Sequence, residues 1–303
     1  PRLSVRYLLA RRLSAKLSYS KMNQYIHLLS NSYISQPTDI WVPVTRNINP
    51  MNAHQYTAGL YYTLHRQYNF SVEGYYKRMN NLIDYKDRIQ VGTDYSNWEE
   101  RVGVGYGRAY GVEFMAQKKA GRLSGWIGYT LSWSDRRFPD ESVNKGRRFP
   151  SKYDNRHKID LVATYKLSRK VELTAAWMFA SGNHITILDQ LYHGGTGQTD
   201  NGYMQDGYPV IGDDNIGYAA SSRNNYQLSP YHRLDLGVNF YRYKKKGRLG
   251  VWNLSLCNTY GHPNPFSVRT KYYTNYDTGK KEVFLEQSIL FLFLPSVSYT
   301  YKF

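Results

Sequence analysis

The sequence predicts an all-β protein, a transmembrane antiparallel up-and-down β-barrel. Two observations predict this class. Apolar and polar side chains alternate with a period of two along most of the 303 residues, and short and long connections alternate between the segments that show this pattern. Successive side chains of a strand point to opposite faces, so each segment forms a strand with one apolar and one polar face.

About eleven strands are expected from this alternation. It is clearest in residues 56–64, 123–133, 159–167 and 234–240, where leucine, isoleucine, tyrosine and tryptophan fall on every second position. The expected strand centres, in chain order, are Val5, Leu17, Leu60, Val72, Phe114, Ile127, Leu161, Ala175, Leu236, Leu254 and Tyr299.

The connections between the expected strands are alternately short and long. Tight turns are expected at 10–12, 65–68, 120–122, 168–170 and 244–247, and long loops at 31–53, 88–102, 135–156, 183–230 and 261–290. In a meander this order places all short turns at one end. Membrane barrels have short periplasmic turns and long extracellular loops, whereas the loops of a soluble β-protein with an aromatic core, the alternative, rarely sort in this way.

Composition excludes several classes. No window approaches 18 uninterrupted apolar residues, which excludes a helical membrane span. The single cysteine, Cys257, excludes a disulfide scaffold and a cysteine-based zinc site. An aromatic content of 16%, with 31 tyrosines, is too high for a disordered chain.

The net charge of +17 (Lys+Arg 40, Asp+Glu 23) predicts an anionic partner. Basic residues divide between the two ends of the expected barrel, which favours membrane lipid and lipopolysaccharide over nucleic acid. Those in the tight turns are Arg11, Arg12, Lys118, Lys119, Arg122, Arg169, Lys170, Lys244, Lys245 and Lys246. Those on the loop side are Arg136, Arg137, Arg147, Arg148 and Lys152.

Aromatic residues collect near the strand ends, where membrane barrels carry interfacial girdles. The candidates are Tyr19, Tyr62, Tyr76, Tyr129, Trp133, Tyr165, Trp177, Tyr299 and Tyr301. The last strand places Val297, Tyr299, Tyr301 and Phe303 on one face. This ending resembles that of bacterial outer-membrane proteins, and the resemblance implies a C-terminal signal for membrane assembly.

The odd number of expected strands predicts that further strands are needed to close the barrel. If the last strand runs toward the periplasm, the first strand (3–8) also runs inward from the extracellular side. Single-chain bacterial barrels have an even number of strands, and an open sheet in lipid leaves unpaired N–H and C=O groups at both edges. We therefore expect upstream strands outside this sequence. A strand count wrong by one would instead permit a complete small barrel.

Several segments resemble one known family. They are 107–114 (GRAYGVEF), 125–132 (GWIGYTLS), 149–150 (FP) with 154–157 (DNRH), 230–237 (PYHRLDLG), 258–266, which ends in NPF, and 294–303 (LPSVSYTYKF). They cover most of the chain and are specific only in combination and in this order. The sequence resembles TonB-dependent receptors of the outer membrane, particularly those from Bacteroidetes.

The resemblance implies a barrel of about 22 strands around an N-terminal plug. Residues 1–303 would be the C-terminal portion of the barrel, without the plug and the N-terminal strands. The family imports a scarce nutrient (siderophore, haem, cobalamin or glycan/peptide) with energy from the TonB complex, which acts through the plug segment. No cofactor is implied. The identity of the nutrient and the presence of a surface lipoprotein over the receptor stay open.

The candidate ligand-binding residues are aromatic and histidine side chains of the long loops, since such loops on a rigid scaffold carry binding sites. They are Tyr33, Trp41, His184, Tyr192, His193 and Tyr208. The competing interpretation is a solvated loop, and no metal site is expected. Acidic residues near the two loop histidines, Asp189 among them, are the type that binds Ca²⁺.

No catalytic motif is present, so an enzyme is not expected. The only histidine–acid neighbours that imitate a catalytic pair are His157 with Asp154 and His232 with Asp235. The alternatives to a receptor are a passive porin, an autotransporter translocator and a small outer-membrane enzyme. The enzyme would require activity that is lost on mutation of His157 or His232.

Overall fold

The computed structural model describes residues 1–30, 39–87, 97–187, 190–193, 210–211, 216–244, 247–274 and 281–303. For 190–193, 210–211, 216–219, 269–270, 272–274 and 281–283 the description covers the backbone only. Within these ranges the regular structure consists of strands and two short 3-10 helices. The prediction of an all-β protein is confirmed.

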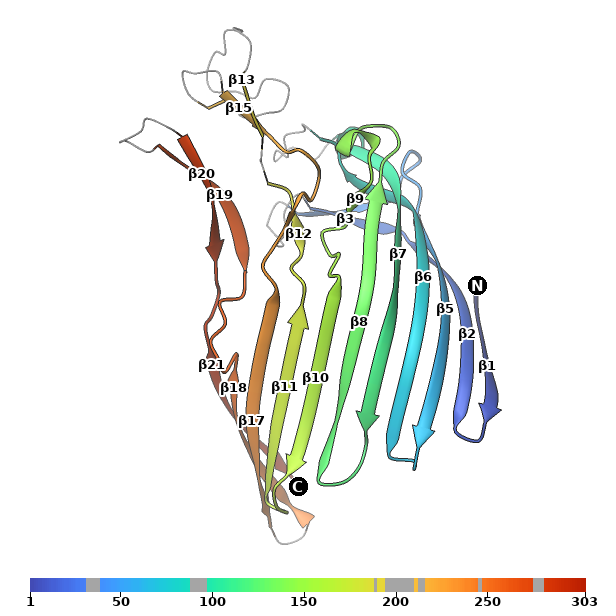
Figure 1. The fold of residues 1–303 in the computed structure, drawn as a ribbon, viewed down its shortest axis with the longest axis vertical. Helices are drawn as coiled ribbons and strands as arrows, with labels where there is room; N and C mark the ends of the chain where they lie inside the picture. Colours follow the sequence, from blue (N-terminus) through green and yellow to red (C-terminus); the bar gives the residue numbers. More distant parts are fainter. Residues whose placement is uncertain are drawn as a thin grey trace.

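Eleven long strands follow one another in chain order in a single antiparallel sheet, and the short β9 (Phe149–Pro150) pairs with one of them (Figure 1). We call this sheet the wall. Its strands are β1 (Arg2–Ala10), β2 (Leu13–Gln24), β5 (Met51–Leu64), β6 (Tyr68–Tyr85), β7 (Val102–Lys118), β8 (Leu123–Arg137), β10 (His157–Lys166), β11 (Val171–Ala180), β17 (Tyr231–Tyr243), β18 (Leu249–Cys257) and β21 (Leu294–Lys302).

All eleven expected strand centres lie in these eleven strands, and the expected tight turns at 10–12, 65–68, 120–122 and 168–170 connect them at one end of the wall (Figure 1). The expected turn 244–247 includes residues 245 and 246, which lie outside the described residues. Some boundaries were wrong. The strand β5 already begins at Met51, inside the expected loop 31–53, and β8 continues to Arg137, inside the expected loop 135–156. The extension of β8 is polar, so it carries no apolar alternation that could mark it as strand, whereas the extension of β5 covers only residues 51–53.

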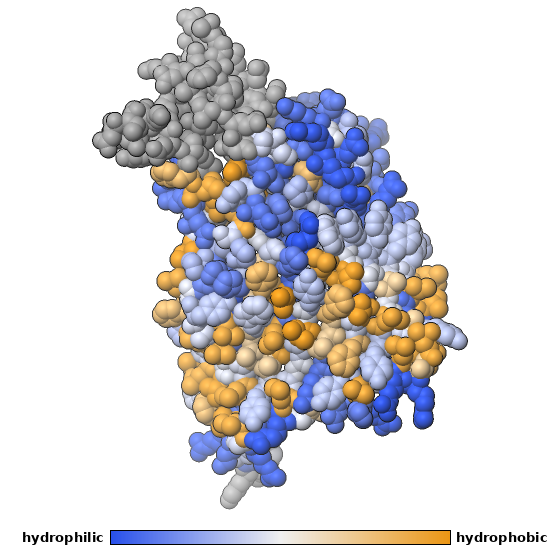
Figure 2. Space-filling view, viewed as in Figure 1, coloured by the Kyte–Doolittle hydropathy of each residue, from blue (hydrophilic) through white to orange (hydrophobic). Residues whose placement is uncertain are grey.

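The apolar face of the wall is exposed. Residues paired in register share a face, and one such row runs across five strands from Tyr19 through Tyr56, Tyr76 and Tyr110 to Trp133. We call it the aromatic row. Leucines on the same face, such as Leu17 (63% exposed) and Leu60 (51%), have no core to enter. Figure 2 shows the resulting hydrophobic band across the wall, with hydrophilic residues above and below it.

Aromatic side chains lie at two levels of the band. On β5 the aromatic row contributes Tyr56, and a second aromatic contact, between Tyr62 and Phe70 (ring centroids 6.4 Å apart), lies closer to the tight turns. Tyr56 and Tyr62 are six residues apart, about 20 Å along an antiparallel strand. Outer-membrane barrels carry an apolar band about 25 Å tall between aromatic girdles.

The opposite face of the wall is polar and carries hydrogen-bonded side chains. On β17, the Asn239 amide donates to Glu172 Oε1 (3.1 Å) and accepts a hydrogen bond from Asn253 (2.7 Å). Tyr241 also donates to Glu172 Oε1 (2.9 Å). Because polar groups cannot face hydrocarbon, this face lines the interior of the barrel.

The long connections lie at the other end of the wall and contain short elements of their own. These are β3 (Ile26–Leu29), β4 (Ile40–Pro43), η1 (Trp98–Arg101), η2 (Asn144–Gly146), β12 (His184–Ile185), β13 (Gln190–His193), β14 (Val210–Ile211), β15 (Ile216–Ala219), β16 (Tyr226–Gln227), β19 (Ser267–Thr274) and β20 (Lys281–Ser288). The strand β4 and the hairpin β19–β20 lie in regions expected to be loops, whereas β3 lies just before the expected loop 31–53. In 267–274 the strand is polar on both faces, so it lacks the alternation that marks the wall.

Within the described ranges, the wall is an open sheet that begins with β1 and ends with β21. Each of these strands has one neighbour, β2 and β18 respectively. The described residues include no helix of the length and apolarity needed to cross a membrane.

Candidate functional site

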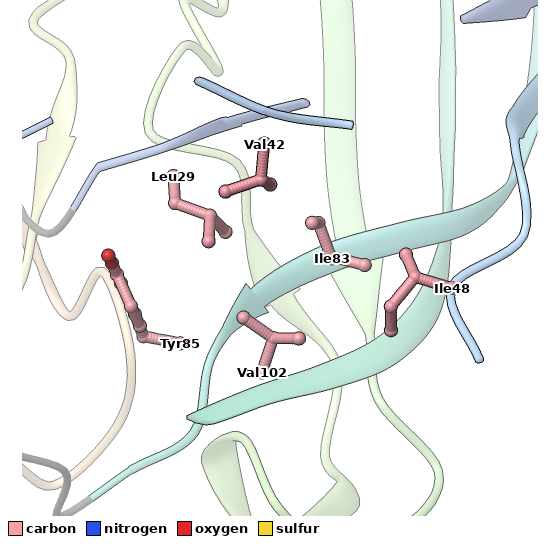
Figure 3. Close-up of a cluster of buried hydrophobic side chains, with 6 residues drawn as sticks. All are labelled: Leu29, Val42, Ile48, Ile83, Tyr85 and Val102. Carbon is pink, nitrogen blue, oxygen red and sulfur yellow. The ribbon is translucent and has the colours of Figure 1, made fainter. Parts of the chain in front are cut away.

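The loop end of the wall has its own hydrophobic core. Strands β6 and β7, the longest in the wall, extend to this end, and the hairpin β3–β4 packs on their tips (Figure 3). The core, here called cluster 1, consists of Leu29, Val42, Ile48, Ile83, Tyr85 and Val102, all at most 9% exposed. It fixes the hairpin β3–β4 and Ile48, all in the loop 25–50, on β6 and β7.

A second core, cluster 2, lies beside it and anchors the loop 138–156. Its members are Leu82, Phe138, Val143 and Phe149, with the two phenylalanine rings stacked at 6.1 Å. Two glycines of β7 make room for it. A Cβ on Gly105 would lie 2.7 Å from the Phe138 ring, and one on Gly107 would lie 2.8 Å from Leu82 Cδ1.

Arg223 joins three loops above the two clusters. Its guanidinium donates to Asp84 Oδ1 (3.0 Å) and to the Tyr85 carbonyl oxygen (2.9 Å), and lies 3.6 Å from Asp87 Oδ1. The other oxygen of Asp84 is 3.5 Å from Arg136 Nη1. Charge-assisted hydrogen bonds of this kind are about twice as strong as neutral ones.

Asn144 completes this network from the loop 138–156. Its backbone N–H donates to Asp87 Oδ2 (2.5 Å), and its side-chain oxygen accepts from the Arg223 N–H (2.9 Å). Arg147 donates to the Ser221 carbonyl oxygen (3.1 Å). We call residues 84–87, 138–156 and 221–225 the loop platform. They are far apart in sequence and are held here as one body.

The loop platform is cationic on its surface. A hollow of about 370 Å³ in the loop 138–156 is lined by Arg137, Pro139, Glu141, Lys145, Gly146, Arg147 and Arg148. One carboxylate faces four cationic side chains there. Such a surface attracts anions.

Of the predicted ligand-binding residues, Trp41 lies in β4 and is 66% exposed. Its neighbour Val42 points into cluster 1, so Trp41 points to the opposite side of the hairpin. It is paired in register with Leu28, which is also exposed. The indole is available for contact, but it is not part of the loop platform.

His184 lies in β12, in the loop 181–230, and is half-buried. Burial lowers the pKa of its imidazole, with the nearby Asp154 acting in the opposite direction. Its backbone N–H donates to the Lys152 carbonyl oxygen (3.1 Å), which ties this loop to the loop 138–156. The lowered pKa disfavours the charged form of this side chain, which lies close to Asp154 and Arg156 of the loop 138–156.

The structure describes no side chain of the other predicted loop residues. Tyr33 and Tyr208 lie outside the described residues, as does Asp189. Tyr192 and His193 lie in β13, which pairs with β15, and only their backbone is described. Their role as ligand contacts stays a prediction.

The two histidines that imitate catalytic pairs bond to tyrosines. His157 Nδ1 is 2.9 Å from Tyr129 Oη, and His232 Nδ1 is 2.8 Å from Tyr260 Oη. Asp154 instead pairs with Arg156 (3.1 Å), and Asp235 with Arg233 (2.9 Å). Among the residues that can be described, no group of three metal-ligating side chains comes together.

The C-terminal residues share one face, as predicted. Val297 and Tyr299 pair in register with Leu254 and Trp252 on β18, and the Tyr299 and Trp252 rings are 4.7 Å apart. Phe303 follows the end of β21 and is fully exposed. Their role in membrane assembly stays a prediction.

Sequence reasoning missed Asp84, Asp87, Asn144 and Arg223. One signal was available: the glycines at 105 and 107, which leave space on β7 for cluster 2. The charged partners gave no signal, because the residues that meet are up to 139 positions apart.

Comparison with known proteins agrees with this architecture. A family model for the TonB dependent receptor-like β-barrel matches residues 1–283. No curated protein sequence matches the chain.

Solved structures share the fold. The ferric yersiniabactin uptake receptor FyuA from Yersinia pestis aligns with 100% of this chain and 37% of its own (TM-score 0.55, 12% identity). The ferric-catecholate import receptor Fiu from E. coli K12, in its closed form, aligns with 99% and 34% (TM-score 0.53, 12% identity). The ferripyoverdine receptor of Pseudomonas aeruginosa aligns with 90% and 29% (TM-score 0.53, 12% identity). The chain thus spans about a third of the length of these receptors.

Proposed function

Because this chain belongs to the β-barrel family of TonB-dependent receptors, which lie in the outer membrane, we propose that it forms part of a receptor that captures a scarce nutrient and imports it actively. The observation that carries the proposal is the loop platform. It is held rigidly at one end of a wall with a lipid-compatible outer face and a polar inner face. Long ordered loops on a rigid scaffold are where binding sites are built.

The charge of the loop platform favours an anionic nutrient. Four cationic side chains and one carboxylate line its surface hollow. Of the nutrient classes that the family resemblance implies, a negatively charged metal chelate or haem fits this surface better than a neutral glycan. Exposed aromatic side chains such as Trp41 suit the flat rings of these ligands.

The rest of the receptor completes the barrel in this proposal. The open edges at β1 and β21 require partner strands, since unpaired backbone groups are costly in lipid. Residues 1–303 then supply the C-terminal portion of a larger barrel, the remaining strands pair with its edges, and a plug fills the interior. The TonB complex acts on the plug segment.

Uptake by whole cells tests the proposal. Cells that carry the native full-length receptor are given radiolabelled ferric chelates, haem, cobalamin and oligosaccharides, with and without a functional TonB protein. We expect uptake of one anionic class, which stops when TonB is deleted or the proton gradient is collapsed. Uptake that persists in both cases, with an open conductance in planar bilayers, would identify a passive porin instead.

A substitution in the loop platform links the activity to this site. Arg223→Gln removes the guanidinium that pairs with Asp84 and Asp87, and loss of one charged hydrogen-bonding group typically costs about 2 kcal/mol. We expect about 30-fold weaker binding of the nutrient, with the assembled barrel unchanged in heat-modifiable electrophoresis. The matched control is Arg46→Gln, an exposed arginine of the loop 25–50, which should bind normally. If both variants bind the nutrient equally well, the loop platform is not part of the nutrient-binding site.

A further inference from the structure

The inner face of the wall carries a polar cavity at its tight-turn end. The cavity has a volume of about 500 Å³ and lies across β10, β11 and β17. Its lining residues are Lys166, Ser168, Arg169, Glu172, Tyr241 and Tyr243. Because the tight turns of an outer-membrane barrel lie on the periplasmic side, the cavity lies where the barrel interior meets the periplasm. We call it the mouth cavity.

The turn 168–170, which forms one side of the mouth cavity, is held in a fixed shape. The Ser168 hydroxyl oxygen accepts hydrogen bonds from the backbone N–H groups of Lys170 and Val171, both at 3.1 Å. The Tyr241 backbone N–H donates to the Lys170 carbonyl oxygen (2.8 Å), which ties the turn to β17. The backbone that carries Arg169 is therefore fixed relative to the other lining residues.

The carboxylate of Glu172 is held from the β17 side of the mouth cavity. Its Oε1 atom accepts hydrogen bonds from the Tyr241 hydroxyl (2.9 Å) and the Asn239 amide (3.1 Å). Lys166 is paired in register with Glu172, but within the part of the chain that the structure describes the two side chains form no ion pair. Nor does a described residue donate a hydrogen bond to Glu172 Oε2. This oxygen can accept a hydrogen bond from a ligand.

The rest of the lining combines positive charge with aromatic rings. Lys166 and Arg169 have no carboxylate partner among the described side chains, and their two charges exceed that of the single acidic lining residue, Glu172. The rings of Tyr241 and Tyr243 also line the cavity, and Tyr243 is 63% exposed. The mouth cavity therefore offers two cations, one hydrogen-bond-accepting carboxylate and two flat rings to a ligand.

We propose that the mouth cavity binds a planar organic anion that also carries a hydrogen-bond donor, as a hydroxylated aromatic carboxylate does. Lys166 and Arg169 bind the carboxylate of this ligand through charge-assisted hydrogen bonds. The tyrosine rings contact the flat ring of the ligand. A hydroxyl group of the ligand donates a hydrogen bond to Glu172, so an anion that lacks a donor leaves this carboxylate oxygen without a partner and binds less tightly.

The mouth cavity adds an exit site to the proposed import function. The loop platform, whose surface attracts anions, lies at the opposite end of the wall. An anionic nutrient with aromatic groups that crosses the barrel interior meets the mouth cavity before it enters the periplasm. The role as an exit site rests on the proposed function, whereas the binding of a planar anion does not.

Binding of protocatechuate, a dihydroxybenzoate, to the full-length receptor tests the chemistry of the site. Receptor purified in detergent is titrated by equilibrium dialysis. We expect Lys166→Gln and Arg169→Gln each to weaken binding about tenfold. The matched control is Lys170→Gln, which lies beside Arg169 in the same turn but outside the lining and should bind normally. Cyclohexanecarboxylate, which has the charge but neither the flat ring nor the hydroxyl groups, should bind about tenfold more weakly than protocatechuate.

Import assays test the exit role separately. In cells that import a nutrient through this receptor, the Lys166→Gln/Arg169→Gln double variant should lower the maximal import rate, while the affinity for the nutrient at the cell surface stays unchanged because the loop platform is intact. Normal import by this variant would overturn the exit role. If protocatechuate does not bind the wild-type receptor, or binds all variants equally, the site itself is overturned. If wild-type cells import none of the nutrients tested, the proposed function fails, and the protocatechuate titration still decides whether the site exists.

Discussion

Leu28 and Leu29 are neighbours in β3 with opposite environments: Leu28 is 42% exposed and Leu29 is 1% exposed. Leu29 belongs to cluster 1, which holds the hairpin β3–β4 of the loop 25–50 on β6 and β7. Truncating a fully buried leucine to alanine costs about 2–5 kcal/mol. We expect Leu29→Ala to detach this loop, seen as faster hydrogen exchange in 25–50, with the wall strands unaffected. Leu28→Ala is the control, and equal acceleration by both would contradict the role of cluster 1.

His27, also in β3, makes this loop sensitive to pH. The side chain is 3% exposed, and burial lowers the pKa of its imidazole below the usual value of 6.5. The folded loop therefore binds a proton less readily than the unfolded loop, so its stability is complete above pH 6.5 and declines as the pH falls below that value. Hydrogen exchange in 25–50, corrected for intrinsic rates, should accelerate at pH 5.5 relative to pH 7.5. In the His27→Gln variant, hydrogen exchange in 25–50 should no longer depend on pH in this range. If the pH dependence is unchanged in this variant, a group other than His27 causes it.

At the scale of single strands, we expect the two faces of β5 to differ in whether they tolerate a charged residue. Leu60 lies on the exposed apolar face, between Tyr56 and Tyr62, whereas Thr57 lies on the polar face. A lysine on the lipid face near the membrane midplane costs about 2–4 kcal/mol. We expect Leu60→Lys to reduce the assembled, heat-modifiable fraction of the receptor, while Thr57→Lys assembles normally. Normal assembly of both variants would show that this face does not contact lipid.

The wall strands could be predicted because each repeats one simple pattern over eight or more residues. In β17, Leu234, Leu236 and Val238 alternate with polar residues, and the same face then continues in register on both neighbours. The hairpin β19–β20 has no such pattern, because polar residues occupy both alternate sets of positions in 267–274. Its strands are held by backbone pairing and by contacts such as Lys271 with Glu286 (2.8 Å).

The loop platform could not be predicted for a related reason. Asp84 lies at the end of β6, and Asn144 and Arg223 lie in loops, where polar residues are common. Only the three-dimensional path of β6 and β8 brings them together. The candidate residues chosen from sequence, such as Trp41 and His184, were correctly placed in the loops, but neither belongs to the Arg223 network.

For the whole molecule, the open edges of the wall lead to a prediction about the native receptor. If the rest of the barrel pairs with β1 and β21, the amides of 2–10 and 294–302 are protected on both sides. We expect these segments to exchange hydrogen as slowly as the central strand β7 in receptor purified from outer membranes, and the polypeptide to exceed 35.4 kDa. Fast exchange in both edge segments would contradict pairing with further strands.

The Arg223 network also limits how the cell-surface end of this protein can change. Antibodies and phages that bind the loops select for altered surface residues. A substitution at Asp84, Asn144 or Arg223 disturbs three loops together. The described hydrogen bonds of the hairpin β19–β20 instead run within residues 263–288. Variation among strains should therefore collect in this hairpin, which would act as the variable epitope of an otherwise constant surface.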